Sequence, residues 1–237
     1  IIMTKFNRNN FKIKPVEYKV AMELIVKYHY LHRKAPCSQA FGLFQTDTVN
    51  EQPFEAVENE QLSLFGVASE LNERLIGVVT YGTPASRSLQ RGLCGDEEAN
   101  NVMELTRLWI EDETPKNSES YLIANSMKLV EKEIIVSYAE VEQGHLGIVY
   151  QATNWIYTGL SAKRADWKVD GIDGKHTRHL FDSYGGINKA KEILGSKMIP
   201  KQRPRKHRYV FFNTNKRRRK QLLKKLRYPI EKYPKTT

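Results

Sequence analysis

The chain has 237 residues, of which 40% are hydrophobic and 10% aromatic, a length and composition that suit one well-packed domain rather than two. It has no apolar run near the ~20 residues that a membrane-spanning helix needs, so we expect a soluble protein of the cytoplasm. Its two cysteines, Cys37 and Cys94, are too few for a disulfide framework and lack the paired spacing of a zinc site, so we expect two free thiols.

The net charge of +11 is concentrated at one end of the chain. Residues 201–237 contain 15 Lys and Arg and a single acid, Glu231, whereas residues 1–200 contain 23 Lys and Arg and 26 Asp and Glu. A basic segment on a nearly neutral body is typical of a protein that binds a polyanion. We therefore expect a catalytic domain over 3–213 and a basic tail over 214–237 that binds nucleic acid and adds little core.

The first predicted element is a helix that opens at Pro15. Its apolar residues at four-residue spacing are Val16, Val20, Leu24 and Tyr28. An exposed loop is expected over 45–60. The apolar runs 62–68 and 75–81 then predict the two strands of a hairpin, and a polar, glycine-containing loop should follow over 85–100.

Beyond residue 100, predicted strands alternate with predicted helices. The strands cover 102–110, 134–138, 157–162 and, late in the chain, 207–212. The helices cover 121–132, with Asn117 and Ser118 as favourable N-cap residues, and a stretch around 148–156. This order predicts an α/β fold with a mixed sheet between helices, although the pattern weakens past residue 163.

Two stretches resemble the GCN5-related N-acetyltransferase superfamily. Residues 104–110, followed by a turn and a helix from Ser118, look like its core strand and cofactor-binding helix, and 150–160 resembles its closing helix and strand. The resemblance implies an acetyltransferase-like sheet and a donor such as acetyl-CoA. Asn117, Ser118 and Ser120 would either cap the helix or bind the phosphate or carboxylate of a cosubstrate. Residues 115–120 lack the usual Gly-rich turn, so a different small carboxylate-bearing donor stays open.

Five further stretches, in order along the chain, resemble the Mom proteins of bacteriophages. They are 28–30, 77–84, 115–120, 137–140 and 144–150. The resemblance implies an enzyme that installs a methylcarbamoyl-type group on N6 of adenine in double-stranded DNA, and so protects phage DNA from restriction. It also implies iron.

Adenine N6 is a poor nucleophile and is hydrogen-bonded inside a duplex, so such an enzyme must extrude the base, stack it and help remove a proton. Together with the resemblance, this makes His29, Tyr30, Glu140 and Tyr150 the candidate catalytic residues, which we expect to converge on one pocket. Tyr81, Tyr138 and His145 are the candidates for substrate contact. Spacing alone leaves a capping or packing role open for each.

A His, carboxylate and phenolate set of a kind that iron accepts could come from His29, Glu140 and Tyr150, with His145 as an alternative ligand. Where the family usually has Asp, this chain has Glu140, which keeps the carboxylate and lengthens its reach.

Near the C-terminus, eight cations are the candidate DNA contacts: Arg205, Lys206, Arg208, Lys216, Arg217, Arg218, Arg219 and Lys220. Two other functions are compatible with the sequence. One is a conventional acyl-CoA-dependent N-acetyltransferase acting on a nucleic acid, protein or small amine, and the other is a non-catalytic nucleic-acid-binding protein.

Overall fold

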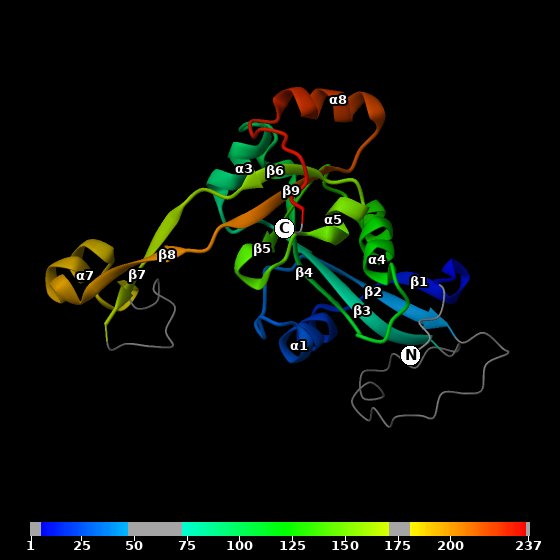
Figure 1. Ribbon diagram of the computed structural model, residues 1–237, viewed down its shortest axis with the longest axis horizontal. Helices are drawn as coiled ribbons and strands as arrows, with labels where there is room; N and C mark the ends of the chain where they lie inside the picture. Colours follow the sequence, from blue (N-terminus) through cyan, green and yellow to red (C-terminus); the bar gives the residue numbers. More distant parts are fainter. Residues whose placement is uncertain (1–5, 47–72, 171–180, 236–237) are drawn as a thin grey trace.

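The computed structural model describes residues 6–46, 73–170 and 181–235 (Figure 1). Its body is a seven-stranded sheet in the order β1-β2-β3-β4-β5-β9-β6. The strands are β1 Phe11–Pro15, β2 Gln39–Thr46, β3 Glu73–Gly82, β4 Val102–Ile110, β5 Ile134–Glu140, β6 Ile156–Leu160 and β9 Lys206–Phe212. The predicted mixed sheet is thereby confirmed.

The sheet splits between β4 and β5, which pair over only part of their length. These strands are parallel, whereas the other neighbouring pairs of this sheet are antiparallel. Their ladder covers only Val102–Glu104 against Ile134–Val136, so the C-terminal halves of the two strands separate. Ser137 bridges the start of the gap, because its Oγ donates to the carbonyl oxygen of Leu105 (2.9 Å).

Helices cover both faces of the sheet. They are α1 Tyr18–Tyr28, α3 Arg87–Cys94, α4 Ser118–Ser126, α5 Ile148–Ala152 and α8 Lys216–Lys225. Strand side chains alternate between faces, so on β3 Val79 and Tyr81 join the core under α4, whereas Val78 packs in the cluster under α1. None of the described helices is long and apolar enough to cross a membrane.

The early part of the chain departs from the predictions. Pro15 ends β1 instead of opening the helix, which begins at Tyr18. On the side opposite β4, β3 pairs with β2, a strand that the sequence analysis did not predict. The predicted hairpin strand 62–68 and most of the loop 45–60 lie outside the described residues. Within the expected loop 85–100 lies α3, whose N-terminus is capped by Ser86 through its Oγ and the N–H of Leu89 (3.2 Å).

Between β6 and β9 the chain forms an arm. It consists of the two-stranded ribbon β7 Arg164–Val169 and β8 Met198–Arg203, together with α7 Ile187–Leu194. A small core holds the arm together, built from Val169, Phe181, Ala190 and Met198. Figure 1 shows the arm projecting away from the main sheet.

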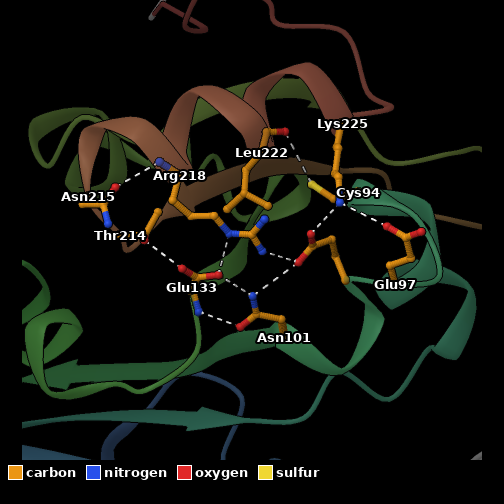
Figure 2. A network of polar contacts seen from close by, with 10 residues as sticks. Cys94, Glu97, Asn101, Glu133, Thr214, Asn215, Arg218, Leu222 and Lys225 are labelled. Carbon is orange, nitrogen blue, oxygen red and sulfur yellow. Dashed lines mark hydrogen bonds and ion pairs between the residues drawn. The ribbon is translucent and has the colours of Figure 1, made fainter.

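The C-terminal segment packs on the body, so the expectation that it adds little core is wrong. Arg218, Leu222 and Lys225 share one face of α8. Leu222 is fully buried against Leu93 and Val102. Figure 2 shows the polar contacts that flank it.

These polar contacts join α8 to three acids of the body, and Lys225 contacts one of them, Glu97, at 3.2 Å. Arg218 contacts Glu98 (2.6 Å) and Glu133 (3.0 Å), and Lys225 contacts Glu98 (2.8 Å). Beyond α8, the hydroxyl of Tyr233 donates to the carbonyl oxygen of Trp155 (2.6 Å). Charge composition did not reveal this packing because the apolar residues that make it, Leu222 with Leu223, Leu226 and Tyr228, are few among many cations.

Candidate functional site

A cleft of about 780 Å³ opens where β4 and β5 separate. Its walls are the end of α1, the exposed halves of β4 and β5, and the loop that leads into α5. The residues that bear on its chemistry are Tyr28, His29, Tyr30, Glu104, Arg107, Trp109, Tyr138, Glu140, His145, Tyr150 and Lys206.

The cleft brings together residues that are more than 100 positions apart in the chain. His29, Tyr30, Glu140 and Tyr150 all line it, so the expected convergence is confirmed as geometry. The end of α1 reaches β4 through the stacked rings of Tyr28 and Trp109, whose centroids are 5.0 Å apart. Strand β5 ends at Glu140 on the other side of the opening.

His29 is a neutral imidazole. Burial, followed by the charge of Arg107, lowers its pKa to about 4, although Glu140 opposes the shift. The N–H of Leu31 donates to its Nδ1 (3.1 Å), so Nδ1 is the acceptor and Nε2 carries the proton. His29 therefore offers the cleft a hydrogen-bond donor.

Aromatic rings surround this imidazole. Tyr30 stacks on His29 with centroids 4.3 Å apart, and His145 meets Tyr30 edge-on at 5.3 Å. Burial, followed by the charge of Glu140, raises the pKa of Tyr30, so its hydroxyl stays protonated at neutral pH. The cluster combines flat faces with neutral hydrogen-bonding groups.

Charged groups line the opposite wall. Glu140 accepts a hydrogen bond from Lys206 Nζ (2.5 Å). Burial raises the pKa of the neighbouring Glu104, and burial also lowers the pKa of Arg107. The Nε of Arg107 is buried and has no hydrogen-bond partner among the described residues. A ligand oxygen would satisfy this donor.

The predicted iron site does not fit these residues. Tyr150 is 7% exposed and hydrogen-bonds with Ser137 Oγ (2.8 Å), and burial raises its pKa to about 12, which disfavours a phenolate ligand. Among the residues that the structure describes, no group of three or more His, Cys, Asp and Glu side chains is placed to hold a metal ion.

Tyr81 lies in the core, so its predicted contact with substrate is wrong. The ring is fully buried and its hydroxyl hydrogen-bonds with Ser126 Oγ (2.7 Å). Tyr138, in contrast, lines the cleft as expected, as does His145.

The three candidate cofactor-binding residues hold the turn before α4. Asn117 has a left-handed backbone (φ 78°) and its side chain makes no capping hydrogen bond. Ser118 is 2% exposed and its Oγ donates to the carbonyl oxygen of Pro115 (2.7 Å), and Ser120 Oγ donates to that of Asn117 (3.0 Å). Both hydroxyls thus stabilise the turn instead of capping the helix. Glu119 is the residue of this turn that lines the cleft.

The candidate DNA contacts divide into two groups. Four are held by the protein itself: Arg205 by the carbonyl oxygens of Ser161 and Leu160, Lys206 by Glu140, Arg208 by Thr158, and Arg218 by Glu98 and Glu133. The expectation is wrong for Arg208, which is 7% exposed and lies 3.4 Å from the ring centroid of Tyr228. It is also wrong for Arg218, whose charge is neutralised by two acids.

The second group lies on α8 and faces outward. Lys216, Arg217 and Lys220 are exposed, while Arg219 lies over the ring of Phe211 at 5.9 Å. Both cysteines are free, as expected.

Four other residues of the cleft were not among the candidate site residues: Tyr28, Glu104, Arg107 and Trp109. For Glu104 and Arg107, on the predicted core strand, the sequence leaves a structural or a cofactor-facing role open. A usable signal was present in β4, where two charged residues interrupt an otherwise apolar strand. Charges inside a central strand need partners or a ligand, so they mark a site.

The Mom protein family model matches residues 10–235. A curated relative, described as Methylcarbamoylase mom of Escherichia phage Mu, is 30% identical over 184 residues, which cover 76% of this chain and 74% of the relative. Two solved acetyltransferases are similar in fold. Ribosomal-protein-S5-alanine acetyltransferase from Vibrio fischeri is 9% identical with a TM-score of 0.43, covering 90% of this chain and 98% of that one. Arabidopsis thaliana NAA60 in complex with acetyl-CoA is 11% identical with a TM-score of 0.45, covering 85% and 98%. On the family match and the phage relative, this chain belongs to the Mom protein family.

Proposed function

We propose that the protein is a transferase that adds a methylcarbamoyl-type group to N6 of adenine in double-stranded DNA, and that it protects phage DNA from restriction in the cytoplasm of the host. Family membership and the methylcarbamoylase of phage Mu support this function. The observation that carries it is the meeting of His29, Tyr30 and Glu140 in one aromatic cleft, because these residues come from separate segments that resemble Mom proteins.

The aromatic rings would receive the extruded base. Tyr28 and Tyr30 are 46% and 44% exposed at the cleft, and Trp109 stacks under Tyr28. A flipped adenine needs such flat apolar faces to replace the stacking that it loses in the duplex. In this proposal Tyr30 and the pair of Tyr28 and Trp109 supply them.

The polar wall would assist the transfer. A new bond forms between N6 and the CH₂ carbon of the donor, the bond from that carbon to its leaving group breaks with the electron pair going to the leaving group, and N6 loses a proton. Glu140 is the acceptor proposed for that proton, held in place by Lys206. His29 donates a hydrogen bond from Nε2, either to an acceptor nitrogen of the base or to the carbonyl oxygen of the transferred group.

The donor is proposed to be a small molecule that carries a carboxylate and a CH₂–C(O)NH₂ group whose CH₂ carbon is bonded to the leaving group. Acetyl-CoA has its leaving group on the carbonyl carbon, so it would serve only in the alternative function, N-acetylation. Arg107 favours the carboxylate, because this cation lines the cleft and its buried Nε lacks a partner among the described residues. Glu119, which also lines the cleft, makes it less suitable for a diphosphate. The exposed cations of α8, Lys216, Arg217 and Lys220, would add to DNA binding.

Mass spectrometry of nucleosides from the DNA of cells that express the protein tests this function. The wild-type protein should yield deoxyadenosine carrying a methylcarbamoyl group, and Glu140→Gln should yield none while it keeps the fold and DNA affinity. The matched control is Glu142→Gln, the same change on an exposed residue two positions later, which should retain activity. The proposal is contradicted if the DNA of cells that express folded wild-type protein is unmodified, or if Glu140→Gln modifies DNA as fully as the wild type. Acetylated products would instead favour a conventional acetyltransferase.

A further inference from the structure

The two faces of the β7–β8 ribbon differ in chemistry. Paired positions alternate between faces along the ribbon. One face carries Ala165, Trp167 and Val169 opposite Gln202, Pro200 and Met198, and its apolar residues pack with α7 in the small core of the arm. The other face carries Arg164, Asp166 and Lys168 opposite Arg203, Lys201 and Ile199.

The charged face of the ribbon forms one wall of a groove of about 900 Å³. The groove continues into the candidate active cleft, because Glu104, Tyr138, Glu140 and Lys206 line both. Seven Lys or Arg and three Asp or Glu line the groove, so it is basic overall.

Several of these cations are already neutralised or buried. Arg203 pairs with Asp166 (3.1 Å), Lys206 pairs with Glu140, and Arg208 is buried. Four others are exposed and form no ion pair within the described part of the chain: Arg33, Arg164, Lys168 and Lys201. A row of unneutralised cations beside an open groove suits a ligand of high negative charge density.

We propose that this groove holds duplex DNA, with the charged face of the β7–β8 ribbon against the phosphate backbone. The inference rests on the proposed function. It assigns the binding of the duplex to the arm, whereas the sequence analysis assigned it to the C-terminal tail. A duplex carries one negative charge per about 1.7 Å of axis, and Lys168, Lys201 and Arg164 on an extended ribbon can contact successive phosphates. An adenine extruded from a duplex in the groove enters the adjoining cleft directly.

The test compares two double variants of the full chain on the same arm. Lys168→Gln with Lys201→Gln removes two charges from the groove, whereas Lys189→Gln with Lys197→Gln removes two exposed charges from parts of the arm that do not line it. Fluorescence anisotropy with a labelled duplex gives affinity at salt concentrations from about 50 to about 300 mM. Thermal unfolding checks that both variants keep the fold.

The groove variant should bind the duplex roughly tenfold more weakly, and the slope of log affinity against log salt should fall by about 2. The arm control should match the wild type in both. Equal affinity and slope for the groove variant and the wild type overturn the inference, as does tighter binding of an RNA duplex of the same sequence. Modified adenine made at wild-type rates by a groove variant with unchanged affinity refutes the DNA groove and leaves the proposed function standing. Normal DNA binding without any modified adenine refutes the function and leaves the groove.

Discussion

Arg218→Met should destabilise the protein because Arg218 is one of two cations that neutralise Glu98. The side chain of Glu98 is 7% exposed and contacts both Arg218 and Lys225. Burial by itself would raise the pKa of Glu98, but hydrogen bonds from Lys225, Arg218 and Asn101 outweigh it and lower the pKa to about 2. Removing Arg218 also leaves Glu133 with fewer partners.

The magnitude follows from the pKa of Glu98. The difference between its ordinary 4.5 and about 2 corresponds to about 3 kcal/mol of folding free energy at about 1.4 kcal/mol per pKa unit. Three donors share this contribution, so the loss of Arg218 alone should cost about 1–2 kcal/mol near neutral pH. The folded pKa is depressed, so the contribution is fully present above about 4.5 and is lost as the pH falls toward about 2.

Urea unfolding of wild-type protein and Arg218→Met near pH 7 and near pH 3 measures this effect. The variant should lose about 1–2 kcal/mol near neutral pH and less near pH 3. Without Arg218 the pKa of Glu98 rises, so Glu98 is partly protonated near pH 3 in the folded variant and still mostly ionised in the wild type. Arg217→Met is the matched control, since Arg217 is an exposed neighbour on α8 with no ion pair in the described part of the chain, and it should change stability by less than about 0.5 kcal/mol. Equal losses for Arg218→Met at both pH values, or a loss no larger than that of Arg217→Met, would refute the reasoning.

Three further predictions follow from the packing. Leu222→Ala should lower the free energy of unfolding by about 2–5 kcal/mol because the side chain is fully buried, and a denaturant midpoint close to the wild-type value would contradict this. Ser118→Ala should cost about 1 kcal/mol of stability through the lost hydrogen bond to Pro115 and leave the KM for the donor unchanged, so a rise in KM alone would restore Ser118 to the donor site. Nitrogen NMR of His29 should show the Nε2–H tautomer and no titration above about pH 5.5, because its folded pKa is about 4, and a transition near its ordinary pKa would contradict the neutral donor.

Periodicity was a reliable guide in the second half of the chain, where each element has one clear face. The strands β4, β5, β6 and β9 and the helices α4 and α5 all lie where the sequence predicts them, apart from shifts at their ends. The pattern missed β2, because a strand buried on both faces shows no alternation. It also missed the arm, because β8 has Gln202 on its packed face and Ile199 on its charged face, which breaks the alternation.

The sequence predicted which residues lie in the candidate site better than it predicted what each of them does. Strand ends and motif order placed His29, Tyr30 and Glu140 in one cleft, and the structure agrees. The substrate contact predicted for Tyr81 and the iron-ligand role predicted for Tyr150 failed for a physical reason. A tyrosine that opens into a site and one whose hydroxyl is buried have the same local sequence, and only tertiary packing decides which hydroxyl meets another protein group.

The basic residues after residue 200 are contiguous in the sequence, but they belong to three different elements of the fold. After residue 200 the chain runs along the arm in β8, enters the main sheet as β9 and returns over the body as α8. Lys201 therefore faces the groove, Arg208 stabilises the sheet from within, and Arg218 neutralises buried acids. Net charge counts all three alike, although a cation that is buried or paired with a protein acid contributes less to neutralising a phosphate than an exposed, unpaired one. The proposed binding of DNA thus depends on where the fold leaves charge unpaired, and in the described residues this includes the groove that opens into the cleft.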